Sequence, residues 1–155
     1  MNISFRLLTE AELDVASDIL AAAYHFTGDH SEMVRDILAL QPDGWWLALA
    51  DGAPVGYGGA VDYGAFGYIG MLSIYPSMQN QGIGTALTRH ILQWGEERAC
   101  PTMLLDADER AARLYTRLGF IEEDITYLFH RKASATRLQA LSSVAVLQPT
   151  DIPDV

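Results

Sequence analysis

The spacing of apolar and polar residues divides the first part of the chain into strands and helices. Residues 3–8 alternate as a strand does, and the Thr9-x-x-Glu12 sequence after them matches a helix capping box. A helix is therefore predicted from this point to about residue 23. Residues 31–40 place apolar side chains on one helical face again, which predicts a second, short helix.

Three apolar runs follow, over residues 44–50, 53–61 and 66–75. The first two are separated by Asp51-Gly52, a dipeptide that supplies the positive φ angles of a two-residue hairpin turn. The third run ends at a proline, which cannot continue a paired strand. These runs predict an antiparallel meander.

Beyond the meander the pattern alternates between helices and strands. Helices are predicted over residues 82–99 and 108–118, and strands over 102–105 and 120–130. Gly119 follows the second helix in the C′ position, where a positive φ angle is easy for glycine. A meander followed by β-α-β-α-β predicts an α/β (α+β mixed sheet) fold flanked by helices, a layout that several enzyme classes share.

The composition fits one globular domain. At 155 residues, with 50% hydrophobic and 19% charged residues, the chain can bury a core without disulfides or metals. Cys100 is the one cysteine, and it precedes Pro101 without a histidine nearby in the sequence, so a nucleophilic role is disfavoured. Since no Cys/His cluster has zinc spacing, we expect no metal.

Charge and hydropathy limit the partners. Twenty acidic against ten basic residues give a net charge of −10, which argues against a nucleic-acid surface and would attract a cationic amine, although acidity also simply favours solubility. Residues 1–20 lack both a basic leader and a continuous apolar run, and no window is long and apolar enough to span a bilayer. We therefore expect a cytoplasmic protein that does not bind membranes.

Residues 74–85 carry the candidate chemistry: a strand end, a polar loop and the first turn of a helix. The unpaired N–H groups and partial positive charge of a helix N-terminus can bind a pyrophosphate without a cationic side chain. Gly82 and Gly84 would allow close approach. The segment does not match two common phosphate-binding motifs. A P-loop needs lysine at the position of Thr85, and a dinucleotide-binding motif needs glycine at the position of Leu87. Taken alone, the two glycines fit a tight strand-to-helix turn equally well.

Two segments resemble a known family. Gln79-x-x-Gly82-x-Gly84, preceded by an apolar strand and Pro76, resembles the Q/R-x-x-G-x-G/A motif of the GNAT superfamily of acyl-CoA N-acyltransferases. Residues 111–120, AARLYTRLGF, resemble that superfamily's A-x-x-x-Y-x-x-x-G-F segment. The matches keep the family's order and spacing. The resemblance implies a GNAT domain over residues 1–131 that uses acetyl-CoA as co-substrate.

Within the superfamily, the segments 57–59, 68–74 and 104–107 resemble a bacterial subgroup with an L-D-A-T-P-x-G-x-x-L-Y segment. A second GNAT-like domain commonly follows in that subgroup. Residues 108–111, DERA, depart from its T-P-x-G pattern. Asp108 also occupies the position that many members fill with asparagine, so its contact with CoA is an open question.

The resemblance assigns roles to individual residues. Main-chain groups of the loop and helix start are expected to bind the pyrophosphate: Gln79, Asn80, Gln81, Gly82, Ile83, Gly84 and Thr85. Main-chain groups of one strand would pair with the pantetheine arm: Leu72, Ser73 and Ile74. The N–H of Leu72 would stabilise the oxyanion, and Tyr115 would protonate the departing thiolate. Further cofactor contacts are expected from Asp108, Ala111 and Tyr115, although the spacing of Tyr115 fits core packing as well.

The acceptor side is less defined. In family members the loop after the first helix lines the acceptor site, which here implies Tyr24, His25 and Phe26 as substrate contacts. The sequence offers no unique general base: the candidates, besides a water chain, are His25, His30, Glu32 and Asp62.

Trp45 and Trp46 straddle the start of a strand, so one should face the core and the other either solvent or the acceptor cleft.

The expected function is transfer of the acetyl group of acetyl-CoA to an amine of a small molecule, by direct attack through a tetrahedral intermediate. The alternative is a non-catalytic domain that binds or senses acyl-CoA. Residues 132–155 form a tail, which is either a docking segment or a linker with the start of a truncated second GNAT-like domain. Apolar residues in this tail predict a homodimer sealed by exchanged tails as one outcome.

Overall fold

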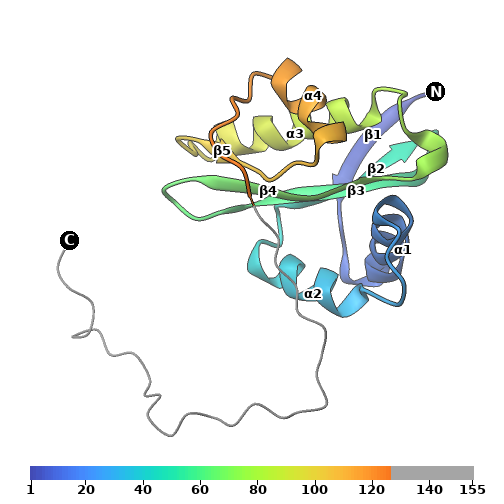
Figure 1. Cartoon of the computed structure of the whole chain (residues 1–155). Coiled ribbons are helices and arrows are strands. Elements are labelled where there is room, and N and C mark those ends of the chain that lie inside the picture. The colour runs from blue at the N-terminus through green and yellow to red at the C-terminus, as the bar shows by residue number, and fades with distance from the viewer. Residues whose placement is uncertain (127–155) are drawn as a thin grey trace, which may run out of the picture. The chain divides into compact units, whose positions relative to one another are not determined.

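The structure is a computed structural model, and it describes residues 1–126. Residues 1–124 form a compact unit with one five-stranded mixed sheet, shown in Figure 1, whose strands lie side by side in chain order. The strands are β1 (Ile3–Leu7), β2 (Trp45–Ala50), β3 (Ala53–Asp62), β4 (Gly67–Ile74) and β5 (Met103–Leu104). The first four pair antiparallel, and β5 pairs parallel with β4. The predicted α/β fold with a mixed sheet is confirmed.

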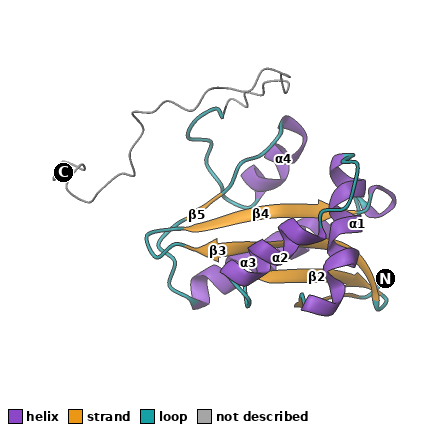
Figure 2. Ribbon diagram, turned by 90° about the horizontal axis from the view of Figure 1, so that it is seen from below, coloured by secondary structure: helices purple, strands orange, loops and turns teal. Residues whose placement is uncertain are grey.

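Helices cover both faces of the sheet (Figures 1 and 2). On one face lie α1 (Leu13–Tyr24) and α2 (Ser31–Leu40), and on the other lie α3 (Ile83–Glu97) and α4 (Glu109–Arg117). Short 3-10 turns, η1 (Glu10–Glu12) and η2 (Pro76–Met78), precede α1 and the loop that leads to α3. The strand-to-helix connection before α3 is thus held at the end of β4.

The two faces bury separate apolar clusters, and this corrects the expectation for the tryptophan pair. Trp46 packs with α3 residues such as Leu87 and Ile91, whereas Trp45 packs with Ile19 of α1 and Val34 of α2. Both indoles are buried, at 2% exposure for Trp45 and 5% for Trp46. Neither faces solvent or a cleft, because neighbouring strand residues point to opposite faces and helices cover both.

Local turn chemistry agrees with the sequence in two places. Asp51 and Gly52 have φ angles of 48° and 88° and join β2 to β3 as a two-residue turn. Gly119, with φ of 92°, ends α4: its N–H donates to Thr116 O, and the N–H of Phe120 donates to Tyr115 O. These two bonds form a Schellman motif.

The capping box behaves differently from its sequence pattern. The Thr9 hydroxyl donates to the Glu12 carboxylate (2.7 Å) and makes no bond to a helix N–H group. The same carboxylate accepts hydrogen bonds from the guanidinium of Arg6 on β1. A 3-10 turn therefore forms first, and α1 begins at Leu13.

The predicted last strand is not formed in the part that the structure describes. Residues 120–126 have no regular secondary structure, and the remainder of the predicted strand, 127–130, lies outside the described residues. The tail of residues 132–155 also lies outside the described residues. The predicted start of a second domain and the predicted exchange of tails therefore concern residues that the structure does not describe.

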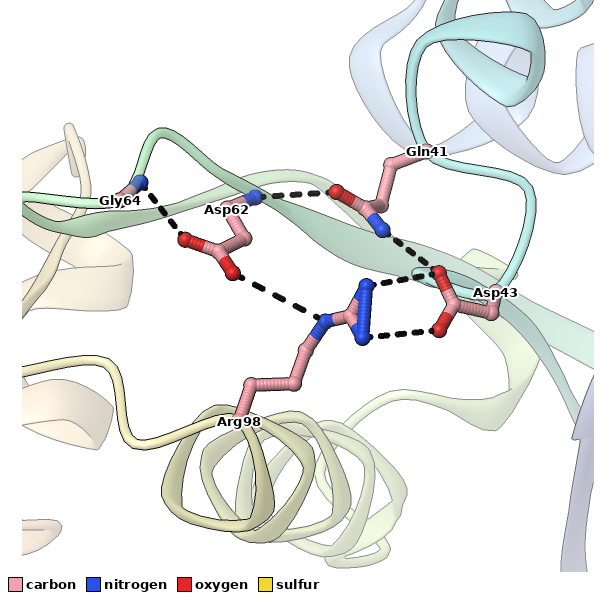
Figure 3. A network of polar contacts seen from close by, with 5 residues as sticks. All are labelled: Gln41, Asp43, Asp62, Gly64 and Arg98. Atoms are coloured by element: carbon pink, nitrogen blue, oxygen red, sulfur yellow. Dashed lines mark hydrogen bonds and ion pairs between the residues drawn. The ribbon is translucent and has the colours of Figure 1, made fainter.

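A polar network ties α3 to the other side of the sheet (Figure 3). Arg98, just after α3, contacts the Asp43 carboxylate (3.2 Å) and the Asp62 carboxylate (3.9 Å). Gln41 donates to Asp43 (2.5 Å) and accepts from the N–H of Asp62 (3.3 Å), while Asp62 accepts from the N–H of Gly64 (2.7 Å). The network joins the ends of α2, β3 and α3.

Candidate active site

A β-bulge interrupts the pairing of β3 with β4. Tyr57 pairs with Ser73 and Gly59 with Gly70, so Met71 and Leu72 together stand opposite the one residue Gly58. Met71 takes a positive φ of 56°, and the Ser73 hydroxyl donates to Met71 O (2.8 Å). A bulge of this kind redirects the strand and its main-chain groups, and bulges are frequent beside active sites.

The outer edge of β4 is paired over only part of its length. Its register with β5 covers Gly67 with Met103 and Tyr68 with Leu104. Within the described residues, the remaining part of β4, which includes Leu72, Ser73 and Ile74, pairs with no strand on that side. An unpaired strand edge can accept an extended ligand as if it were another strand. The edge therefore fits the pantetheine contact predicted for these residues.

The loop after η2 ends at an uncapped helix. Asn80 and Gly82 have positive φ angles of 60° and 83°, and Gly82 is the N-cap of α3. No side chain among the described residues caps this helix. Alternation of left- and right-handed residues turns successive N–H groups toward one side, which is how backbone binds anions.

The two glycines of the motif have different roles. A Cβ atom at Gly82 would meet no atom within 4 Å, so this position faces open space at the helix start. A Cβ atom at Gly84 would meet Leu114 Cδ1 at 3.4 Å and Ile74 Cγ1 at 3.8 Å. Gly84 therefore serves the packing of α3 against α4 and β4, and close approach of a ligand is left to Gly82.

Side chains of the loop hold its shape. Gln79 donates through Nε2 to Ile74 O (3.0 Å), and Gln81 donates through Nε2 to Ser77 O (3.2 Å). Ile83 is buried in the core beneath the sheet face that α3 covers. The ligand contacts predicted for the main chain of Gln79 to Thr85 stay a prediction. The residues present thus fit a pyrophosphate, because an uncapped helix start and a glycine facing open space are what such an anion needs.

Tyr115 of α4 is buried at 7% exposure, with its ring edge-on to Phe120 at 5.7 Å between centroids. Burial, followed by the nearby Tyr24 and Asp108, raises the pKa of Tyr115 to about 12. The hydroxyl of Tyr24 in turn donates to Leu72 O (3.3 Å). The structure thus brings α1, the bulge of β4 and α4 to one place.

Asp108 is the N-cap of α4. Its Oδ1 accepts from the N–H of Ala111 (2.8 Å), and its Oδ2 lies 3.6 Å from Nε of Arg110. Asp108 and Ala111, both predicted as cofactor contacts, are therefore bonded to one another at the start of the helix that carries Tyr115. Capping accounts for the choice of aspartate here, since a carboxylate is a strong N-cap.

The loop between α1 and α2 presents the predicted acceptor residues. His25 is the C-cap of α1, with φ of 57°, and Phe26 stacks on Tyr24 at 5.4 Å. Phe26 also lies edge-on to His30 at 5.5 Å. Tyr24 and Phe26 are half-exposed. Among the candidate bases, Asp62 belongs to the Arg98 network at the end of β3.

Sequence reasoning missed one contact at this site. The Tyr68 hydroxyl of β4 donates to Asp106 Oδ2 (2.5 Å), just beyond β5. The two residues are 38 positions apart in the chain, and no local spacing links them. Only the expectation that the 66–75 and 102–105 strands are neighbours in one sheet could have pointed to it.

The sequence profile of the Acetyltransferase (GNAT) family matches residues 13–120, which span the bulge, the loop and Tyr115. The chain belongs to the GNAT acetyltransferase family. A mycothiol acetyltransferase of Streptomyces coelicolor is 38% identical over 93 residues, which are 56% of this chain and 30% of the relative. One of Stackebrandtia nassauensis is 33% identical over 114 residues, 64% of this chain and 37% of the relative. The chain thus spans about a third of the length of these curated relatives.

Solved structures share the fold. A protein of Pyrococcus horikoshii described as an acetyltransferase candidate superposes with a TM-score of 0.72 at 28% identity, over 78% of this chain and 44% of that chain. The aminoglycoside N-acetyltransferase AAC(6')-Iy, solved in complex with CoA, superposes with a TM-score of 0.67 at 18% identity, over 85% of this chain and 96% of that chain.

Two properties of residues 1–126 bear on partners. No helix in this range combines the length and the apolar character needed to cross a membrane. No three His, Cys, Asp or Glu side chains in the same range gather as metal ligands would.

Proposed function

We propose that this GNAT family member transfers the acetyl group of acetyl-CoA to the amine of a small molecule. The observation that carries the proposal is the convergence of three features: the bulge at Leu72, the uncapped start of α3 and the buried side chain of Tyr115. The unpaired edge of β4 leads from the first to the second. Each feature meets one requirement of acyl transfer: the bulge stabilises charge, the start of α3 anchors the co-substrate, and Tyr115 donates a proton.

Each part of the chain has a separate task in this proposal. The main chain of residues 79–85 holds the pyrophosphate, and Leu72 to Ile74 bind the pantetheine arm as an added strand would. When bound, acetyl-CoA supplies an activated acyl group. The amine nitrogen attacks the carbonyl carbon and loses its proton through a water chain, while the N–H of Leu72 stabilises the charge that develops on the carbonyl oxygen. As the carbon–sulfur bond breaks, Tyr115 gives its proton to the departing sulfur, and solvent reprotonates the phenolate. Aligned reactants need no covalent enzyme intermediate.

The environment of Tyr115 supports its role as the acid. Burial favours the neutral form of a phenol, and its raised pKa of about 12 keeps the proton in place across the neutral range. A thiol has an ordinary pKa near 8.5, so proton transfer from the phenol is uphill even to a fully formed thiolate, and it needs the phenolate to be reprotonated from solvent. Tyr115 therefore acts as a donor late in the reaction, when the carbon–sulfur bond breaks.

The names of the relatives support a small-molecule acceptor. Curated relatives are mycothiol acetyltransferases, and a structural neighbour is an aminoglycoside N-acetyltransferase. The half-exposed Tyr24 and Phe26, beside the bulge through the bond of Tyr24 to Leu72, are the substrate contacts that we propose. His25 lies between them at the C-cap of α1.

A screen for thiol release tests the proposal. The protein is mixed with acetyl-CoA and members of a library of small amines, and free CoA thiol is measured against a blank without amine. Acetyl transfer predicts thiol release that depends on both protein and amine, with an acetylated amine in the product. Binding of acetyl-CoA without release by any amine would indicate the non-catalytic alternative, an acyl-CoA sensor.

A further inference from the structure

Three arginines share one face of α4. Arg110, Arg113 and Arg117 are spaced by three and four residues, so their side chains lie along one side of the helix. All three residues are exposed. They are three of the ten basic residues of a chain that carries twenty acidic ones. We call these three arginines the basic face of α4.

The stability of the helix does not explain the basic face. Like charges four residues apart repel one another on a helix surface, as those of Arg113 and Arg117 do. Arg110 lies in the first turn, where the helix dipole disfavours a cation. Within residues 1–126, an ion pair to a carboxylate is formed by Arg110 alone of the three, with 3.6 Å between its Nε and Asp108 Oδ2. The positive charge of the basic face is therefore available to a bound anion.

The basic face borders the proposed anchor of acetyl-CoA. Leu114 lies four residues after Arg110 and three before Arg117, so it stands beside them on the helix surface. A Cβ atom at Gly84 would meet Leu114 Cδ1 at 3.4 Å, which places Leu114 against the first turn of α3. Helices α3 and α4 cover the same face of the sheet (Figure 1). The arginines on either side of Leu114 thus lie beside the uncapped helix start.

There is room for a ligand between two of these arginines. A hollow of about 350 Å³, within the size range of small-ligand sites, is lined by Ala112, Arg113, Thr116 and Arg117. Arg117 donates through Nε to Arg113 O (3.0 Å), and this bond uses one of the five N–H donors of its guanidinium. Guanidinium groups bind phosphate oxygens through paired hydrogen bonds, so this pair suits a phosphate group.

The co-substrate has a phosphate that the start of α3 does not account for. We propose that the basic face of α4 binds the 3′-phosphate of acetyl-CoA, so that the protein distinguishes CoA from the same compound without this phosphate. The inference rests on the proposed use of acetyl-CoA, in which the start of α3 binds the pyrophosphate. Because a net charge of −10 repels so anionic a compound, a local group of cations would offset the repulsion at the site.

Calorimetric titration of CoA and of 3′-dephospho-CoA into the full chain tests the inference, because the two compounds differ only in this phosphate. At low salt we expect wild type to bind CoA at least about tenfold more tightly than dephospho-CoA, as charge-assisted hydrogen bonds predict. The ratio should shrink as salt is raised, since ions screen exposed charges. Arg113→Gln/Arg117→Gln should lower the ratio to about twofold or less and keep the dephospho-CoA constant within about threefold of wild type.

A matched control removes two positive charges elsewhere. Arg35 lies on α2 and Arg89 on α3, and both are exposed. Arg89 follows Gly84 by five positions, which turns it about 140° away from the side of α3 that meets Leu114. Arg35→Gln/Arg89→Gln has the same net charge as the double variant of the basic face and should keep the wild-type ratio. Circular dichroism melting of each variant checks the fold.

The possible results separate this inference from the proposed function. Binding of both compounds with a wild-type ratio below about threefold would overturn the inference alone, as would a folded Arg113→Gln/Arg117→Gln protein that keeps the wild-type ratio. If neither compound binds, the inference and the proposed use of acetyl-CoA both fail. A preference for CoA without thiol release in the presence of any amine would support the inference and contradict acetyl transfer.

Discussion

Tyr115 serves as a packing residue and as the proposed acid at once. Its ring is buried against Phe120, which also closes the Schellman motif that ends α4. The spacing of residue 115 in the sequence fits either role; the structure shows the packing, and the acid role stays a proposal. Burial supplies the packing and, through the raised pKa of about 12, also holds the proton.

Replacement of Tyr115 by phenylalanine separates the roles, because the ring stays and the proton donor is lost. We expect kcat to fall by about 10- to 10⁴-fold, with the dissociation constant of CoA within about twofold of wild type. A thiol-release assay measures kcat, and calorimetry measures the dissociation constant of CoA. An unchanged kcat would contradict the proposed role of Tyr115 as the acid and leave it a structural role alone.

Among the elements, the antiparallel meander and two features set by local chemistry were predictable from the sequence, whereas the bulge in β4 and the burial of both tryptophans were not. The Asp51-Gly52 turn and the helix stop at Gly119 need only a positive φ angle, which the residue types reveal. The bulge at Met71 and Leu72 results from the register with β3, and the apolar pattern of residues 66–75 does not predict it. The burial of both tryptophans likewise depends on helices packing from two sides.

The connection of β1 to α1 depends on pH through Glu12. Hydrogen bonds from Arg6, then from Thr9, lower the pKa of Glu12 to about 2. A lowered pKa in the folded state means that the contribution is present above the ordinary pKa of about 4.5 and is lost as pH falls toward 2. The same bonds from Arg6 and the Thr9 hydroxyl occupy the Glu12 carboxylate, so the Thr9-x-x-Glu12 pattern does not form a regular capping box.

We therefore expect Glu12→Gln to lower the free energy of unfolding by about 0.5–1 kcal/mol at pH 7, since the ion pair is partly exposed. The difference from wild type should shrink toward zero as the pH of the urea titration is lowered to about 2. Glu10→Gln, in the same turn, is the control. A difference that stays constant with pH would contradict the argument.

The network around Arg98 links elements on both faces of the sheet. Besides its contacts with Asp43 and Asp62, the guanidinium lies 4.9 Å from the ring centroid of Trp94. We expect Arg98→Met to lower the free energy of unfolding by about 1–2 kcal/mol in urea titrations. Arg35→Met removes a more exposed ion pair with Glu10 and should cost less than about 0.5 kcal/mol. Equal costs for the two variants would show that the network adds nothing.

For the whole molecule, the domain of residues 1–131 stays a prediction, and the family match covers residues 13–120 of it. Deletion of residues 142–155 should then leave acetyl-CoA binding within about twofold of the full chain, because no proposed contact lies there. Light scattering of both forms also tests tail exchange: a dimer that becomes a monomer supports it, and an unchanged mass excludes it as the cause of association. Loss of acetyl-CoA binding on deletion would contradict the domain boundary.

The central claim for the molecule is that the start of α3 anchors acetyl-CoA, and calorimetric titration of acetyl-CoA into wild type, Gly82→Val and Gly64→Val tests it most directly. Both glycines have positive φ angles, 83° and 79°, and both face open space, so valine strains the backbone similarly at either site. Gly64 lies in the turn between β3 and β4, away from the loop. We predict saturable binding to wild type and Gly64→Val, and at least about a hundredfold weaker binding to Gly82→Val, where the branched Cβ occupies the space of the phosphates. Wild-type affinity in Gly82→Val, or no binding to wild type, would contradict the account.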